Sequence, residues 1–163
     1  MEFLKLDKND QEFVLKQLKE AAVWLKEQNI DYWQNWHNPS ELHKNWIKEG
    51  LDKGQFYRVY DSDKLIGIFR LQYSDELFWG EHNDKAGYIH SFTTSRKMSG
   101  QDLGYKILDE ITTLLRRKDC DYLRLDCGIK NKKLVEYYKN YGFEEAGTVE
   151  VHQECLQLLE KEI

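Results

Sequence analysis

The sequence predicts a mixed α/β protein, in which a sheet of parallel and antiparallel strands carries helices on its faces. Strands and helices alternate in the second half of the chain, which is the order that brings strands together in parallel. In the first half, two strands are joined by the short polar segment 61–64, which indicates an antiparallel hairpin. Sheets with both kinds of pairing and covering helices belong to the α/β (α+β) classes.

The first elements are a short strand and a long helix. Residues 2–6 alternate between polar and apolar, as a strand does. From Asp10, apolar residues recur three to four apart, which predicts a helix with one buried face. The segment 31–37 is aromatic but aperiodic, which favours a loop.

A second helix is predicted after this loop. Asn38 can cap the helix, Pro39 fits its first position, and Glu41 can reach back to the cap. Gly50 is typical of a helix end. The remaining elements are, in order, strands at 55–60, 65–73 and 86–94, a helix at 102–117, a strand at 122–127, a helix at 131–141, and strands at 143–151 and 155–159.

Length and composition restrict the class of protein. With 163 residues, no repeat and no linker, the chain is expected to form a single domain over residues 1–163. Its net charge of −5 argues against general nucleic-acid binding. It has no apolar run near ~18 residues and no secretory signal, so we expect neither a membrane span nor export. Three cysteines without a CxxC spacing fit a cytoplasmic protein without disulfides or a metal site.

The segment 93–106 leaves a strand and enters a helix within a few residues. The start of a helix exposes unpaired N–H groups that can bind a pyrophosphate, and Gly100 and Gly104 would let it come close. Arg96 and Lys97 could pair with a terminal phosphate. A tight turn without a ligand fits the same residues. The dinucleotide GxGxxG pattern and the lysine-bearing P-loop are both absent, which argues against a Rossmann or NTPase site.

The helix at 131–141 presents a row of polar groups. Asn131 and Tyr138 are seven residues apart, which places them on one helix face about 10 Å apart along the axis. An amide can hydrogen-bond another amide, and a phenol can donate a proton to a developing thiolate. Alternatively, Tyr138 and its tyrosine neighbours are packing aromatics at the edge of the core.

Together, the segments 99–104 and 131–143 resemble the GNAT superfamily of N-acetyltransferases. The family has a loop of the form R/Q-x-x-G-x-G/A after a strand, and later a helix that holds an Asn and an aromatic pair and ends at Gly-Phe. Here the loop is Ser99-Gly100-Gln101-Asp102-Leu103-Gly104, and the later block runs from Asn131 to Phe143. The resemblance is strong over residues 86–147.

The resemblance implies a largely antiparallel sheet of six to seven strands, splayed between the fourth and fifth strands, with helices on both faces. Acetyl-CoA would enter the split as a cosubstrate and no metal would be needed. Tyr138 would be the general acid. The implied cofactor-binding residues are Phe92, Thr93, Thr94, Ser99, Gly100, Gln101, Asp102, Leu103, Gly104, Tyr105 and Asn131.

The loop departs from the family pattern at two positions. Ser99 stands where Arg or Gln is usual, so a phosphate or capping contact would be missing. Asp102 stands where Gly is usual. Asp tolerates unusual backbone angles, but its charge opposes a pyrophosphate, so weaker cofactor binding is expected.

Transfer to an amine needs a group that removes a proton from the ammonium form. The candidate bases are His90 and Glu76, with Glu81 and His82 as further candidates. Each carboxylate could equally be a solvated surface charge, and His90 could be a structural histidine. The tryptophans at 33, 36 and 46 could line the acceptor pocket or pack in the core, and Cys127 could be an incidental buried thiol.

The sequence therefore favours an acetyl-CoA-dependent N-acetyltransferase that acts by direct attack of a primary amine on the thioester. The alternative is a non-catalytic CoA-binding or protein-interaction module on the same fold. The acceptor is a small molecule or a peptide amine, and the sequence leaves its identity open. A homodimer formed through the C-terminal strand is compatible with the pattern.

Overall fold

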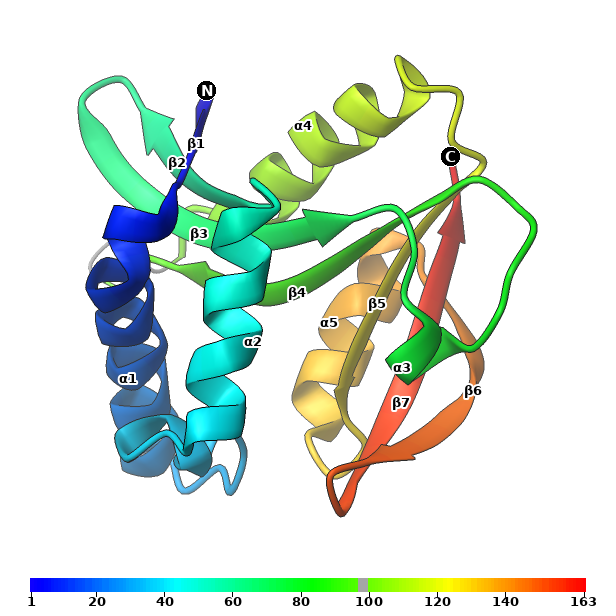
Figure 1. Cartoon of the computed structure of the whole chain (residues 1–163). Coiled ribbons are helices and arrows are strands. Elements are labelled where there is room, and N and C mark those ends of the chain that lie inside the picture. Colours follow the sequence, from blue (N-terminus) through cyan, green and yellow to red (C-terminus); the bar gives the residue numbers. More distant parts are fainter. Residues whose placement is uncertain (97–99) are drawn as a thin grey trace. The chain divides into compact units, whose positions relative to one another are not determined.

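The computed structural model describes residues 1–96 and 100–163 (Figure 1). The strands are β1 (Glu2–Lys5), β2 (Phe56–Asp61), β3 (Lys64–Gln72), β4 (Ala86–Thr94), β5 (Tyr122–Gly128), β6 (Glu144–Val151) and β7 (Glu154–Glu162). The α-helices are α1 (Gln11–Glu27), α2 (Glu41–Asp52), α3 (Glu76–Trp79), α4 (Leu103–Arg116) and α5 (Lys132–Tyr141). Two 3-10 helices, η1 (Lys8–Asp10) and η2 (Gln34–His37), complete the order. The sequence missed α3, η1 and η2, which are each a single turn.

The start and end of α2 differ from the prediction. The N-cap is Ser40, whose side chain accepts a hydrogen bond from the His43 amide, so the predicted cap at Asn38 was wrong. Gly50 does not end the helix. It lies buried within α2, and a Cβ there would come within 2.6 Å of the Phe56 ring. Gly50 is therefore explained by close packing inside its helix.

The strands form one seven-stranded sheet in the order β1-β2-β3-β4-β5-β7-β6. The β4–β5 pair is parallel. The β1–β2, β2–β3, β5–β7 and β6–β7 pairs are antiparallel. The predicted mixed, largely antiparallel sheet with a split between the fourth and fifth strands and helices on its faces is confirmed.

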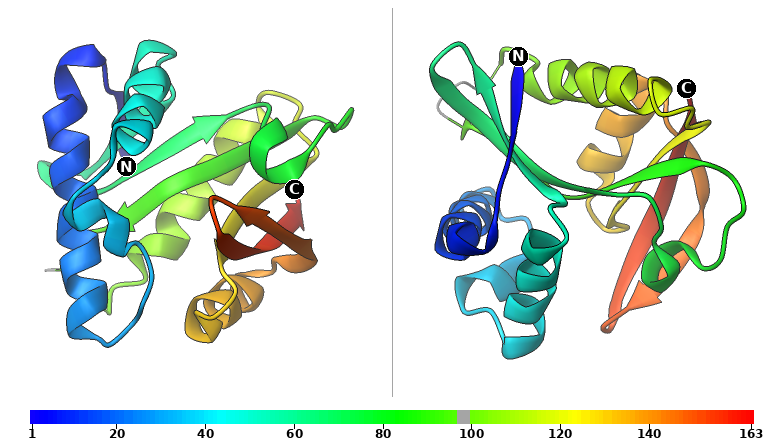
Figure 2. Two further views of the ribbon diagram at one scale, coloured as in Figure 1. Left: turned by 60° about the horizontal axis from the view of Figure 1, so that its bottom comes forward. Right: turned by 45° about the horizontal axis from the view of Figure 1, so that its top comes forward.

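The chain divides into two compact units. The first unit comprises Met1–Arg70 and Ser91–Gly104. Its core is built where the apolar stripe of α1 meets α2 and the strands β2 and β3, which is why those helices show helical spacing of their apolar residues. In this unit α1 and α2 lie side by side (Figure 2). Its buried core residues are Leu6, Val14, Leu18, Ala22, Trp36, Ile47, Leu51, Phe56 and Ile68.

The second unit comprises Leu71–His90 and Tyr105–Ile163. Successive residues of a strand point to opposite faces of the sheet, and β4 uses both faces here. Gly87 faces α4 so closely that an added Cβ would lie 2.4 Å from Leu115. Ala86 and Tyr88 pack instead with Trp79 of α3. One face of β4 is therefore covered by α4, and the other by the segment around α3.

No helix in residues 1–96 and 100–163 is long and apolar enough to cross a membrane.

Candidate active site

The parallel pairing of β4 and β5 stops before either strand ends. The register runs from Ala86 opposite Tyr122 to Ile89 opposite Leu125. His90 on β4 and Asp126 on β5 are the first residues beyond it. The next residue of β4, Ser91, has a φ of 50°, in the left-handed region that is uncommon for residues other than glycine. A strained residue within a strand is a frequent feature of functional sites.

His90 lies between two buried carboxylates. Its Nε2 is 2.7 Å from Oδ2 of Asp75, and its Nδ1 is 3.3 Å from Oδ2 of Asp126. The three side chains are only 6%, 3% and 8% exposed. The Phe78 ring packs against the imidazole at 4.7 Å between ring centroids. We refer to Asp75, His90 and Asp126 as the imidazole cluster.

The two carboxylates of the imidazole cluster differ in their bonding. Asp75 shares a hydrogen bond with His90. Oδ2 of Asp126 has no hydrogen-bond partner among the described residues, because its contact with His90 lacks hydrogen-bond geometry. Burial raises the pKa of Asp126 to about 6. The charge of His90 opposes this rise, whereas those of Asp75 and Glu154 add to it. A buried carboxyl with such a pKa can exchange a proton near neutral pH.

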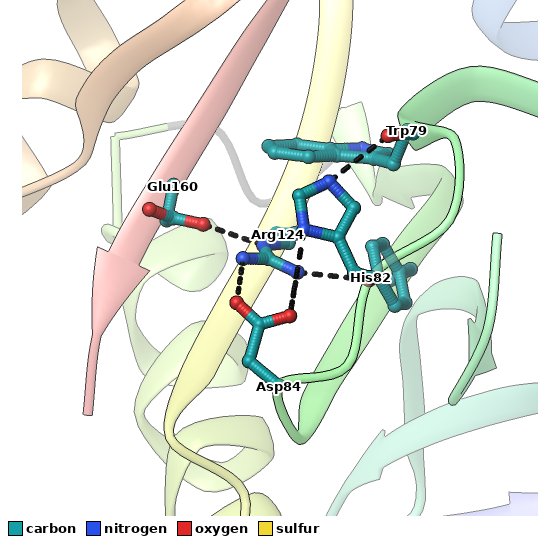
Figure 3. Close-up of polar contacts among 6 residues, drawn as sticks. Trp79, His82, Asp84, Arg124 and Glu160 are labelled. Atoms are coloured by element: carbon teal, nitrogen blue, oxygen red, sulfur yellow. Dashed lines mark hydrogen bonds and ion pairs between the residues drawn. The ribbon is translucent and has the colours of Figure 1, made fainter. Parts of the chain in front are cut away.

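A second polar cluster lies on the same face of these strands, at Arg124 (Figure 3). Its guanidinium is paired with both oxygens of Asp84 and with Glu160, and Nη1 also donates to the Tyr88 hydroxyl at 2.9 Å. The ring of Trp79 lies 5.1 Å from it. We refer to this group as the arginine cluster.

The arginine cluster is a structural element. Arg124 is only 2% exposed, and its contacts join the segment before β4 to strands β5 and β7. His82, which the sequence offered as a base, donates from Nε2 to the Trp79 carbonyl oxygen at 2.9 Å, and its Nδ1 lies 3.5 Å from Asp84 (Figure 3). This position explains His82 without a catalytic role.

The other predicted site residues of the second unit have different environments. Glu76 is exposed at the start of α3. Asn131 caps α5, because its side chain accepts a hydrogen bond from the Leu134 amide at 3.2 Å. Tyr138 is buried on α5 and packs edge-on against Tyr137 and Phe143. Both expectations for Tyr138, an acid and a packing aromatic, fit this position.

In the first unit, the predicted phosphate loop has an unusual backbone. Gly100 and Asp102 have φ angles of 81° and 53°, both in the left-handed region. Asp is among the few residues that adopt this region readily, which explains how it can stand in the position of a glycine. α4 begins at Leu103, as predicted to within one residue. The predictions for Lys97 and Ser99 lie outside the described residues.

Other residues of the first unit are used for packing. Arg96 lies over the ring of Trp24, 3.9 Å from its centroid. Trp36 is part of the core, and Trp33 and Trp46 pack against it. Trp33 has a φ of 60°, which is rare for a bulky residue. Because Trp36 is buried in the core of this unit, packing explains this residue.

A surface pocket of about 460 Å³ opens in the second unit between α4 and α5. Tyr105 stacks on Tyr137 at 4.4 Å between ring centroids, and its hydroxyl donates to the Tyr137 carbonyl. Lys132 and Lys133 line the same pocket and give it positive charge. Flat aromatic rings beside two cations suit a phosphorylated heterocycle. The full lining is Tyr105, Lys132, Lys133, Glu136, Tyr137 and Asn140.

Two groups can be set aside. Burial raises the pKa of the Cys127 thiol to about 12, so this cysteine is not a nucleophile near neutral pH. Among the described residues, no group of three or more His, Cys, Asp or Glu side chains is arranged to hold a metal ion.

The sequence did not single out Asp75 or Asp126. Asp126 alternates with apolar residues in β5, which is the pattern of a solvent-facing position. A usable signal was the position of His90 and Asp126 near the carboxyl ends of two strands predicted to pair in parallel. Asp75 lies in a connecting segment, so no periodicity could indicate its burial.

The sheet order and the opened parallel pair define an acetyltransferase of the GNAT class. The Acetyltransferase (GNAT) family model matches residues 18–143, and the chain belongs to this family. The N-acetyltransferase YesJ of Bacillus subtilis (strain 168), itself uncharacterized, is 25% identical over 159 residues, which are 94% of this chain and 86% of YesJ.

Solved structures share the fold. A GNAT-family acetyltransferase from Listeria monocytogenes has a TM-score of 0.77 at 23% identity, over 99% of this chain and 94% of that one. The enzyme AAC(6')-Ib in complex with ribostamycin and coenzyme A has a TM-score of 0.73 at 17% identity, over 98% of this chain and 92% of that one. At these identities the likeness concerns the fold alone.

Proposed function

We propose that this chain is an acetyl-CoA-dependent N-acetyltransferase that moves an acetyl group to a primary amine by direct attack on the thioester. Membership of the GNAT family and similarity to the N-acetyltransferase YesJ support acetyl transfer. The observation that carries the proposal is the early end of the β4–β5 pairing, followed at once by the buried pair His90 and Asp126. The whole chain would act as one acyltransferase domain, in the cytoplasm, as a monomer or a homodimer.

The pantetheine arm of acetyl-CoA would pair with the backbone of β4 at Phe92, Thr93 and Thr94, in the manner of an added strand. Its pyrophosphate would accept hydrogen bonds from the amides of residues 100–105 at the start of α4. Coenzyme A in complexes of AAC(6')-Ib supports this cosubstrate. Asn131 would contact the arm while it caps α5.

The nucleotide end of coenzyme A would occupy the pocket between α4 and α5. The stacked pair Tyr105 and Tyr137 would form an aromatic wall beside the adenine, and Lys132 and Lys133 would offer charge to its phosphate. Tyr105, which lines this pocket, directly follows the proposed pyrophosphate loop in the sequence.

The acceptor would supply a primary amine. Aminoglycosides are present with AAC(6')-Ib, and a spermidine N-acetyltransferase shares the fold at a TM-score of 0.67. Small polyamines and amino sugars are therefore the first acceptors to test. We propose His90 rather than Glu76 as part of the base, since Glu76 is exposed on α3 and His90 is held among buried carboxylates.

Tyr138 would protonate the departing thiolate of coenzyme A. A Tyr138→Phe variant is expected to lower kcat about 10²-fold, with the dissociation constant of acetyl-CoA within twofold of wild type. Release of free thiol with kanamycin, ribostamycin and spermidine measures the first quantity, and titration calorimetry measures the second. A protein that binds acetyl-CoA but acetylates no amine would instead be a CoA-binding module.

A substitution at Asp102 tests whether the pyrophosphate binds at the loop before α4. Asp102→Gly removes a charge beside the proposed pyrophosphate and keeps the left-handed backbone angle, so acetyl-CoA should bind several-fold more tightly. Calorimetry at low salt would measure the change. Weaker binding by Asp102→Gly would contradict the placement of the pyrophosphate on this loop.

A further inference from the structure

The imidazole cluster holds more negative than positive charge. With an imidazolium at His90 and carboxylates at Asp75 and Asp126, the cluster carries a net charge of −1. A neutral imidazole with both carboxylates ionised would leave −2 in a buried site, which costs more. In either state, negative charge exceeds positive charge among these three residues. Oδ2 of Asp126, which has no hydrogen-bond partner among the described residues, marks the position where a further donor would be satisfied.

The groups that face Asp126 come from three elements. His90 approaches from β4, Asp75 from the segment before α3, and Glu154 from β7. His90 is the only positive group among them. Asp75 is bonded to the far side of the imidazole, at Nε2, so it holds the ring with Nδ1 directed at Asp126. The geometry thus gives the three residues different tasks.

We propose that Asp126 binds the acceptor's ammonium group and accepts its proton, that His90 stabilises the ionised carboxylate of Asp126, and that Asp75 is a positioning residue that fixes the His90 ring. This inference rests on the proposed acetyltransferase function. It also names the acceptor class: an aliphatic amine, which is a cation at neutral pH, rather than an arylamine, which is already neutral.

The proton balance follows from this assignment. The acceptor R–NH₃⁺ gives one proton to Asp126 and becomes R–NH₂. The nitrogen lone pair forms the C–N bond with the thioester carbonyl, and the C–S bond breaks with its electron pair going to sulfur. Sulfur takes a proton from Tyr138, and the proton lost by the new amide nitrogen restores the phenol. The proton on Asp126 then leaves to water, so one proton is released per acetyl group transferred.

Three substitutions test the assignment in the full-length protein. Asp126→Asn has the same shape but cannot accept a proton, so kcat should fall 10²-fold or more while acetyl-CoA affinity stays within twofold. Asp126→Glu should recover part of this loss. Glu76→Gln is the matched control, because Glu76 is the exposed neighbour of Asp75 in sequence, and it should keep wild-type kcat.

The pH profile separates a positioning role from a structural one. For wild type, kcat/KM with spermidine or kanamycin should fall below a pH of about 6, where Asp126 becomes protonated. In Asp75→Asn the His90 ring loses the partner at Nε2 that fixes its orientation, so kcat should fall about tenfold. Loss of the Asp75 charge also removes one cause of the raised pKa of Asp126, so the acid limb should move to lower pH, with thermal unfolding measured in parallel.

These outcomes distinguish failure of the assignment of Asp126 from failure of the proposed acetyltransferase function. Full activity of Asp126→Asn overturns the inference and leaves the acetyltransferase function intact. The same conclusion follows if Glu76→Gln loses activity while the pH profile of Asp75→Asn is unshifted. A wild-type protein that transfers acetyl groups to arylamines but not to aliphatic amines also overturns it. A wild-type protein without transfer to any amine overturns the proposed function, and the inference with it.

Discussion

Two polar clusters lie on one face of β4 and β5, two residues apart along each strand, and they differ in how completely their charges are paired. Tyr88 and Arg124 lie opposite each other within the parallel register, and the guanidinium is surrounded by acceptors. His90 and Asp126 lie just beyond that register, and one oxygen of Asp126 has no hydrogen-bond partner within residues 1–96 and 100–163. The first arrangement stabilises the fold, and the second leaves a group available for chemistry.

Because of this difference in pairing, the pKa of Asp84 in the arginine cluster and the pKa of Asp126 in the imidazole cluster shift in opposite directions. The hydrogen bond with Arg124 lowers the pKa of Asp84, although burial opposes it. Burial raises the pKa of Asp126. A buried charge therefore contributes to stability where its partners are complete, and it weakens stability where they are not. Functional sites commonly carry such a cost.

Removal of the central imidazole should have the largest effect on stability. In His90→Phe, Asp75 and Asp126 face each other without a cation, and the free energy of unfolding at pH 7 should fall by about 3 kcal/mol. The loss should shrink at low pH, where Asp126, whose pKa is raised by burial, takes up a proton. Urea denaturation measures it, with the half-exposed His82→Phe as control. A loss below about 1 kcal/mol would contradict the pairing in the imidazole cluster.

Removal of the guanidinium should cost less. In Arg124→Met the partner carboxylates are 31% and 28% exposed, so water can solvate them, and we expect a loss of about 2 kcal/mol at pH 7. Acetyl transfer at low temperature should persist, because the cluster only supports the fold. Arg124→Lys keeps the charge but not the bidentate geometry, so its loss should lie in between. Equal stability of wild type and Arg124→Met would show that the cluster does not support the fold.

The contributions of Asp126 and Asp84 to the free energy of unfolding should change with pH in opposite directions. The folded-state pKa of Asp126 is raised to about 6 from an ordinary 3.8, so the unfolded chain releases this proton first and stability falls as pH rises through that window. Asp126→Asn should therefore be more stable than wild type at pH 7, with no gain below pH 4. Asp84 has a lowered pKa, so its contribution is present above its unfolded pKa and is lost as pH falls. Asp84→Asn should accordingly destabilise at pH 7.

Glu160→Gln should have the smallest effect. It keeps an acceptor for the Arg124 Nε group but loses one charge at a site that is 28% exposed. We expect a loss of about 0.5 kcal/mol in chemical denaturation. A double-mutant cycle with Asp84→Asn would show whether the two carboxylates act independently on the guanidinium. A loss above 2 kcal/mol for Glu160→Gln alone would contradict this ranking.

Much of the architecture could be predicted from the sequence, because it is encoded locally. The strand at 86–94 and the helix that ends at Tyr141 follow from apolar periodicity and a terminal glycine. The errors were also local. Gly50 has the residue type of a helix end, but it is needed for close approach to Phe56. Its role depends on tertiary packing, which periodicity does not contain.

The candidate site was only partly predictable for the same reason. His90 could be proposed from its strand position, but its partners depend on the segment 75–84 covering one face of β4 and β5. That segment contains one short turn of helix and no periodic pattern. Without that cover, Arg124 and Asp126 look like the solvent side of a half-buried strand. Their burial and pairing arise from contacts distant in sequence.

The most direct test of the account is a ¹³C NMR titration of the Asp126 side-chain carboxyl in the wild-type protein, assigned by comparison with Asp126→Asn. It requires no knowledge of the acceptor. A midpoint near pH 6 is expected, because burial raises the pKa of this carboxyl to about 6 although the charge of His90 opposes the rise. A midpoint at or below the ordinary value of 3.8 would show that Asp126 is fully paired and would contradict its role as the proton acceptor.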